Sequence, residues 1–86
     1  MKEVKMFILA NCPHCKKASQ LKDEILSEHP EYRDVPVKVI DEGKEPAYAE
    51  QFDYYYVPTF YVDDVKMCEG VPSKESIEKV FEEASK

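Results

Sequence analysis

The sequence has no long apolar run and no block of basic residues, and each shortage argues against a class of protein. The longest uninterrupted apolar stretch, Met6 to Ala10, has five residues. It is too short for a transmembrane helix or for the apolar part of a secretory signal, so we expect a cytoplasmic protein with no membrane partner. Acidic residues outnumber basic ones by 18 to 12, for a net charge of −6. Such a chain offers little to neutralise a phosphate backbone, which argues against nucleic acid as a partner.

Cysteine is also scarce. Three cysteines among 86 residues are too few, and odd in number, for a secreted scaffold stapled by disulfides. Two of them, Cys12 and Cys15, lie three positions apart, which is typical of redox or metal chemistry. The length allows one domain, residues 1–86, and the apolar share of 43% is enough for a single small core. We find no repeat or linker, and we expect a monomer.

Apolar periodicity predicts elements in the order β-α-β-α-β-β-α. Strand-like runs, continuous or alternating, cover 4–10, 35–40, 59–62 and 65–68. Helical spacing of apolar residues, with proline or serine at suitable starts, predicts helices from Cys15 to before Pro30, over 46–52 and after Ser73. Asp63-Asp64 suits the two-residue turn of a hairpin. This order predicts an α/β fold with a mixed four-stranded sheet and helices on both faces.

The chemical motif is Cys12-Pro13-His14-Cys15, placed between the first predicted strand and the first predicted helix. A thiolate is the nucleophile in disulfide exchange, and the positive end of a helix stabilises it. Cys12, at the exposed tip, is therefore the predicted nucleophile. Cys15 lies about one helical turn further along and is placed to resolve a mixed disulfide formed on Cys12.

Three neighbours are predicted to support this pair. Protonated His14 adds positive charge, and Lys16 adds a weaker, solvent-screened field, so both should lower the pKa of Cys12. Pro13 suits the first turn of a helix because the N–H that it lacks would have no partner there, and it stiffens the turn between the sulfurs.

A second signal, Val57-Pro58-Thr59, stands just before the third predicted strand. Alone it is weak, because a proline at the start of a strand is ordinary. Together the two motifs and the element order resemble the thioredoxin superfamily in its short glutaredoxin-like form, over essentially the whole chain. The resemblance implies a thioredoxin-like fold in which Pro58 is cis and lies against the active-site disulfide. It also implies that Val57 pairs with an extended substrate, with Thr59 in the same loop. Independently of the resemblance, Tyr54-Tyr55-Tyr56 just before this loop would form an apolar rim for docking partners, or else pack over the predicted helix at 46–52 with their hydroxyls in water.

Departures from the glutaredoxin pattern bear on the substrate. Glutaredoxins that bind glutathione usually carry a lysine before the cysteine pair, a threonine before Val-Pro and a Gly-Gly followed by Asp near the last helix. Here those places hold Leu9-Ala10-Asn11, Tyr56 and Glu69-Gly70-Val71. The stretch from Glu69 to Lys74 looks more like the entry to the final helix of thioredoxins, which favours a protein disulfide over glutathione as the substrate.

The expected function is therefore that of a thiol–disulfide oxidoreductase, an enzyme with no bound cofactor or metal. Its expected partners are disulfide-bearing proteins or glutathione mixed disulfides, and its expected reductant is glutathione or an NADPH-dependent thioredoxin reductase. One alternative is a dedicated electron donor to a single enzyme such as ribonucleotide reductase. Another is a metal module: an iron–sulfur cluster shared by two chains, or zinc on three thiols with Cys68 as the third ligand and His14 or His29 as the fourth.

Overall fold

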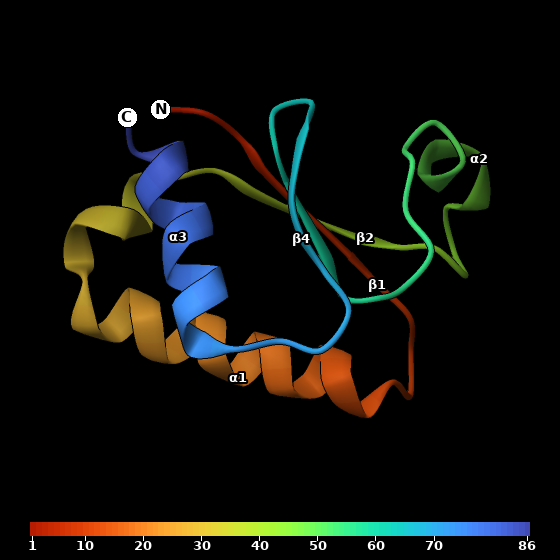
Figure 1. Ribbon diagram of the computed structural model, residues 1–86, viewed down its shortest axis with the longest axis horizontal. Helices are drawn as coiled ribbons and strands as arrows, with labels where there is room; N and C mark the ends of the chain where they lie inside the picture. The colour runs from red at the N-terminus through yellow and green to blue at the C-terminus, as the bar shows by residue number, and fades with distance from the viewer.

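A four-stranded sheet and three α-helices make up the computed structural model, which describes residues 1–86 (Figure 1). The α/β class and the element order predicted from the sequence are confirmed. The strands are β1 Val4–Ile8, β2 Val37–Asp41, β3 Thr59–Val62 and β4 Val65–Glu69. The helices are α1 Pro13–Glu28, α2 Pro46–Ala49 and α3 Lys74–Ala84, with a 3₁₀ helix at Pro30–Asp34.

The strands lie in the order β2-β1-β3-β4. Strand β1 pairs in parallel with β2 and antiparallel with β3, and β3 forms a hairpin with β4. The β1–α1–β2 unit is thus a parallel crossover, which needs a connection long enough for a helix. In this arrangement the two inner strands are β1 and β3, and every residue of β3 is buried.

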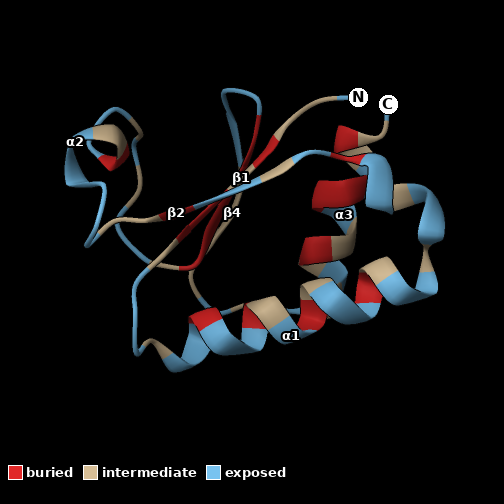
Figure 2. Cartoon of the chain, turned by 180° about the vertical axis from the view of Figure 1, so that it is seen from behind, coloured by how far each residue is buried: buried red, intermediate tan, exposed pale blue.

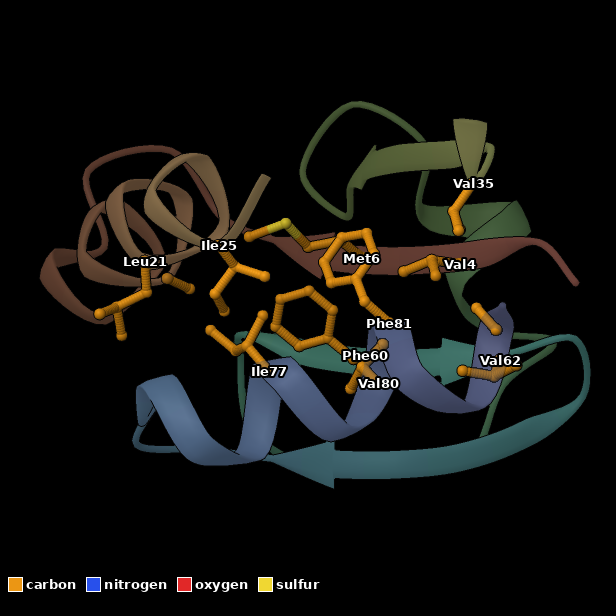
Figure 3. Packing of buried hydrophobic residues seen from close by; sticks show 12 residues of the cluster. Val4, Met6, Leu21, Ile25, Val35, Phe60, Val62, Ile77, Val80 and Phe81 are labelled. Atoms are coloured by element: carbon orange, nitrogen blue, oxygen red, sulfur yellow. The ribbon is translucent and has the colours of Figure 1, made fainter. Parts of the chain in front are cut away.

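Helices cover both faces of the sheet, as predicted. On one face, α1 and α3 pack against the sheet through a cluster in which Met6 and Phe60 meet Ile25, Ile77 and Phe81 (Figure 3). Figure 2 shows the buried stripes of both helices turned toward the sheet. On the other face, the short α2 region covers a smaller cluster, formed by Phe7, Ile40, Ala49 and Tyr61.

Helix α1 is amphipathic, and its pattern dictates its orientation. Cys15, Ala18, Leu21 and Ile25 recur at spacings of three and four, and all four are buried. Burial of one stripe, rather than intrinsic propensity, supplies most of the stability of such a helix. None of the helices has the combination of length and apolar character needed to cross a bilayer.

Helix α3 starts at the predicted cap. The Ser73 hydroxyl accepts from the Ser76 N–H at 3.1 Å, and the Ser76 hydroxyl accepts from the Ser73 N–H at 3.3 Å. This reciprocal arrangement satisfies donors at the helix N-terminus that have no partner within the helix.

Several predicted boundaries were wrong by one to three residues. Strand β1 ends at Ile8, because the chain leaves the sheet there for a turn at Asn11 with φ of 65°. Strand β2 begins at Val37, since Val35 still belongs to the end of the 3₁₀ helix, where its N–H donates to Tyr32. Helix α2 is one turn, Pro46–Ala49, and β4 runs one residue further than predicted, to Glu69.

Candidate active site

Cys12 is the N-cap of α1, at the point where the loop from β1 enters the helix. Asn11 takes a left-handed conformation, which asparagine tolerates better than most residues. Pro13 fills the first turn, and the Lys16 N–H donates to the Cys12 carbonyl at 3.1 Å. The predicted nucleophile therefore lies at the positive end of a 16-residue helix.

The two thiols of the motif are free and have opposite environments, Cys12 being half-buried and Cys15 only 4% exposed. A hydrogen bond from the Cys15 thiol lowers the pKa of Cys12, and the backbone N–H groups of Cys15 and His14 add to the effect. Burial raises the pKa of Cys15 to about 11, assisted by Cys12 and by the negative charge of Glu42, while a backbone hydrogen bond with Leu9 acts against this. Cys12 is thus the thiol prepared to ionise, and Cys15 is the one that keeps its proton.

These opposite shifts predict a pH profile for alkylation of the reduced protein. Iodoacetamide should modify Cys12 with a midpoint below that of an ordinary cysteine, about 8.5, because its thiolate forms as the pH rises through a lowered pKa. Cys15 should stay unmodified until the pH approaches about 11. Mass mapping of the alkylated sites across pH measures both. In Cys15→Ser the Cys12 midpoint should change, since the thiol donor is gone; a Cys12 midpoint above 8.5 in the unmodified sequence would contradict this assignment.

The predicted supporting residues surround Cys12 from the solvent side. Pro13, His14 and Lys16 are all exposed. The lowered pKa of Cys12 has its causes in the Cys15 thiol and in backbone N–H groups, and His14 contributes through its backbone. Activation by the His14 and Lys16 side chains stays a prediction.

A shallow cavity of about 330 Å³ adjoins the cysteine pair. It is lined by the end of β1, the loop after it and the first turns of α1, including Leu9, Asn11, Lys16 and Gln20. Cys68 lies elsewhere, half-buried against the main core, where burial raises its pKa. No group of three or more Cys, His, Asp or Glu side chains is gathered closely enough to hold a metal ion.

The loop around Pro58 leaves the sheet at the same end as the cysteine motif. Phe7 of β1 pairs with Thr59 of β3, and these strands are antiparallel, so β1 ends beside the start of β3. The segment that leads to Cys12 and the segment that precedes Thr59 therefore emerge together. This juxtaposition follows from the sheet topology.

Hydrogen bonds fix the conformation of this loop. The Val57–Pro58 peptide bond is cis, and Pro58 and Thr59 are buried. The Thr59 hydroxyl donates to the Tyr56 carbonyl at 2.5 Å, and the Gly70 N–H donates to the Pro58 carbonyl at 3.0 Å. Neither the N–H nor the carbonyl of Val57 has a hydrogen-bond partner within the chain.

The tyrosines before this loop divide into two kinds. Tyr54 packs on the Phe7 ring with centroids 4.8 Å apart, and its hydroxyl donates to the Glu42 carboxylate at 3.0 Å. Tyr55 and Tyr56 are 85% and 70% exposed. Of the three tyrosines predicted to form an apolar docking rim, only Tyr55 and Tyr56 are therefore exposed enough to do so.

One side chain that contacts this loop was not singled out from the sequence. The Glu69 carboxylate accepts hydrogen bonds from the backbone N–H groups of Tyr55 and Tyr56, and it pairs with Lys66. These contacts, led by the bond from Tyr55, lower the pKa of Glu69 to about 2. Its position next to Gly70 had suggested only the entry to the last helix, and no local motif marks a partner more than ten residues away.

Comparison with known proteins decides the family. The family described as thioredoxin domain matches residues 2–82. The chain belongs to the thioredoxin-domain family. A thioredoxin of Methanocaldococcus jannaschii is 30% identical over 76 residues, which cover 87% of this chain and 86% of that thioredoxin.

Solved structures share the thioredoxin fold. Reduced desulfothioredoxin from Desulfovibrio vulgaris Hildenborough has a TM-score of 0.69 at 20% identity, covering 95% of this chain and 80% of that one. The structure of a malarial protein also has a TM-score of 0.69, at 15% identity, covering 94% and 93%. The resemblance to the thioredoxin superfamily is thus confirmed, whereas nothing in these matches singles out the glutaredoxin-like form. The chain is a thioredoxin-like redox protein, and the close Cys12–Cys15 pair fits a dithiol motif.

Proposed function

We propose that this protein is a dithiol oxidoreductase that reduces disulfide bonds in other proteins. The observation that carries the proposal is the opposite tuning of two adjacent thiols, with the pKa of the helix-capping Cys12 lowered and that of the buried Cys15 raised. A thiol that ionises readily beside one that stays protonated suits a nucleophile followed by a resolving group. The family match supports the same chemistry.

The proposed cycle has two exchanges. The Cys12 thiolate attacks one sulfur of the partner disulfide, and the other partner sulfur leaves as a thiolate that takes a proton from water. Cys15 then gives up its proton to water, and its thiolate attacks the Cys12 sulfur; the bond between Cys12 and the partner breaks, and the second partner sulfur leaves as a thiolate that takes up a proton. Two electrons pass to the partner, and the protein is left with a Cys12–Cys15 disulfide.

The proposed substrate is a polypeptide in extended conformation. The unpaired N–H and carbonyl of Val57, beside the cis-proline, offer one donor and one acceptor to a neighbouring strand. The glutathione-binding residues expected of glutaredoxins are absent from the corresponding positions, which hold Tyr56 and 69–71 among others. Glutathione or an NADPH-dependent thioredoxin reductase would restore the dithiol, and we propose a cytoplasmic, monomeric protein with no bound cofactor.

The test supplies two reducing systems in parallel, glutathione with its reductase and thioredoxin reductase, and follows NADPH consumption. Insulin serves as the protein disulfide and a glutathione mixed disulfide as the second substrate. Insulin reduction in either system supports the proposal, and the system that works identifies the reductant. Turnover of the mixed disulfide alone would make glutathione mixed disulfides the substrate. Silence in both systems would overturn the proposal and favour a dedicated partner enzyme.

A further inference from the structure

Of the three residues before Pro58, two have backbone N–H groups that are already hydrogen-bonded within the chain, and one does not. The N–H groups of Tyr55 and Tyr56 both donate to one oxygen, Oε2 of Glu69, the second at 2.9 Å. The N–H of Val57 donates to nothing within the chain. A single side chain therefore decides which donors of this exposed segment remain open to another molecule.

Glu69 is well placed to do this. It is the last residue of β4 and pairs with Thr59 at the start of β3, so its backbone is held by the sheet. Its second oxygen, Oε1, accepts from Lys66 Nζ at 2.9 Å, and its side chain is only 19% exposed. Charged acceptors make stronger hydrogen bonds than neutral ones, and a glutamate carboxylate is charged at neutral pH. The hydrogen bonds from Tyr55, Lys66 and Tyr56 lower its pKa further, to about 2.

We infer that Glu69 is a positioning residue that sets the register in which an extended peptide disulfide docks beside Pro58. It binds the N–H groups of Tyr55 and Tyr56 and so leaves Val57 as the donor open to a substrate strand. Strand pairing has a side-chain period of two, so a slip by one residue would turn the substrate's side chains to the opposite face. This inference rests on the proposed function, and it assigns Glu69 no contact with the reacting sulfur atoms.

Loss of the carboxylate should therefore affect peptide and small substrates differently. Without it, the N–H groups of Tyr55 and Tyr56 compete with Val57 for a substrate strand, and wrongly registered complexes hold the disulfide away from Cys12. A small disulfide such as hydroxyethyl disulfide has no peptide backbone to pair with the loop. Its reaction depends on Cys12 and is expected to change much less.

The experiment mixes pre-reduced protein with an excess of disulfide and follows one turnover, which removes any dependence on a reductase. The substrates are a cyclic disulfide peptide and hydroxyethyl disulfide. For Glu69→Ala we expect the half-saturating concentration of the peptide to rise about tenfold, the scale set by one or two backbone hydrogen bonds. The rate constant for hydroxyethyl disulfide should change by less than about twofold.

Two further variants test whether Glu69 sets the register of the docked peptide or only supports the fold of the loop. Glu69→Gln keeps an acceptor oxygen without the charge and should fall between the original protein and Glu69→Ala. Lys66→Ala removes the ion pair with Glu69 but leaves both loop hydrogen bonds, so its loss should be much smaller than that of Glu69→Ala. An equal loss for both disulfides in Glu69→Ala, or a loss in Lys66→Ala as large as in Glu69→Ala, would overturn the inference.

A direct readout of register uses the peptide trapped on Cys12 in a Cys15→Ser background. Amide exchange of the trapped complex should show new protection at Val57 with Glu69 present. With Glu69→Ala, protection by the peptide should be shared among Val57, Tyr55 and Tyr56. Unchanged protection at Val57 alone would refute the role of Glu69, whereas failure of the original protein to react with either disulfide would instead refute the proposed function.

Discussion

Cys12→Ser is expected to abolish disulfide reduction, whereas Cys15→Ser should still attack its partner and then stop at the mixed disulfide. Serine at position 12 has no ionisable thiol, so the first sulfur–sulfur exchange has no nucleophile. Serine at position 15 leaves the Cys12 thiolate in place but removes the group that resolves the adduct. The second variant therefore becomes a trap for the partners of the protein.

Insulin turnover and intact-mass analysis after mixing with a disulfide peptide distinguish these outcomes. Cys12→Ser should show no turnover and no adduct, and Cys15→Ser a stable one-to-one adduct on Cys12. Cys68→Ser is the matched control, because Cys68 packs against the main core away from the motif and should leave turnover in place. Activity in Cys12→Ser, or an adduct on Cys15 in place of Cys12, would refute the assigned roles.

Phe60→Ala is expected to cause a large loss of stability. Phe60 is 1% exposed and lies between the central strand β3 and the two long helices, near Ile25 and Ile77 (Figure 3). Truncation of a buried phenylalanine costs about 3–5 kcal/mol, because the transfer free energy is lost and a cavity remains. A domain of this size has on the order of 5–15 kcal/mol in total, so the loss is a large fraction of its stability, and at the lower end of that range the variant would be close to unfolding.

Urea titration of the reduced protein, followed by circular dichroism, gives the free energy of unfolding for each variant. Val71→Ala is a suitable reference, because Val71 is 77% exposed and its truncation should change that free energy by less than about 0.5 kcal/mol. A loss below 1 kcal/mol for Phe60→Ala would mean that the neighbouring side chains fill the space, and that the core is less tightly packed than the contacts imply.

The elements and the thiol pair were predictable because their signals are local. The stripe of Cys15, Ala18, Leu21 and Ile25 has helical period, and the Cys-x-x-Cys motif lies in four consecutive residues at the strand-to-helix junction. Period and spacing are properties of the sequence itself. They therefore do not depend on contacts made elsewhere in the fold.

The contacts that shape the loop before Pro58 were not predictable in the same way. Glu69 reaches Tyr55 and Tyr56 only because β4 pairs with β3 in a particular register, with an irregularity between Phe60 and Tyr61. The bond from Tyr54 to Glu42 likewise joins residues 12 positions apart. Such partners depend on tertiary packing, which no short window of sequence contains.

The 3₁₀ helix at Pro30–Asp34 was missed for a different reason. Pro30 predicts the end of the preceding helix, yet a proline can also begin a helix because the first turn needs no N–H donor. This 3₁₀ helix is short and tight, and it places Val35 in the core before β2 begins. A proline signal alone does not say whether a new helical turn follows.

The two ends of the chain lie side by side, at the far end of the molecule from the start of α1 (Figure 1). The Lys2 N–H donates to the Ala84 carbonyl at 2.8 Å, and the Lys2 ammonium pairs with Glu83 at 2.7 Å. A tether at either end would hold the protein to an electrode or a resin with Cys12 turned outward. A short peptide could also join the two ends into a ring. The chain could then be opened at the Asp63-Asp64 hairpin turn, which leaves the segment with Cys12 and Cys15 intact.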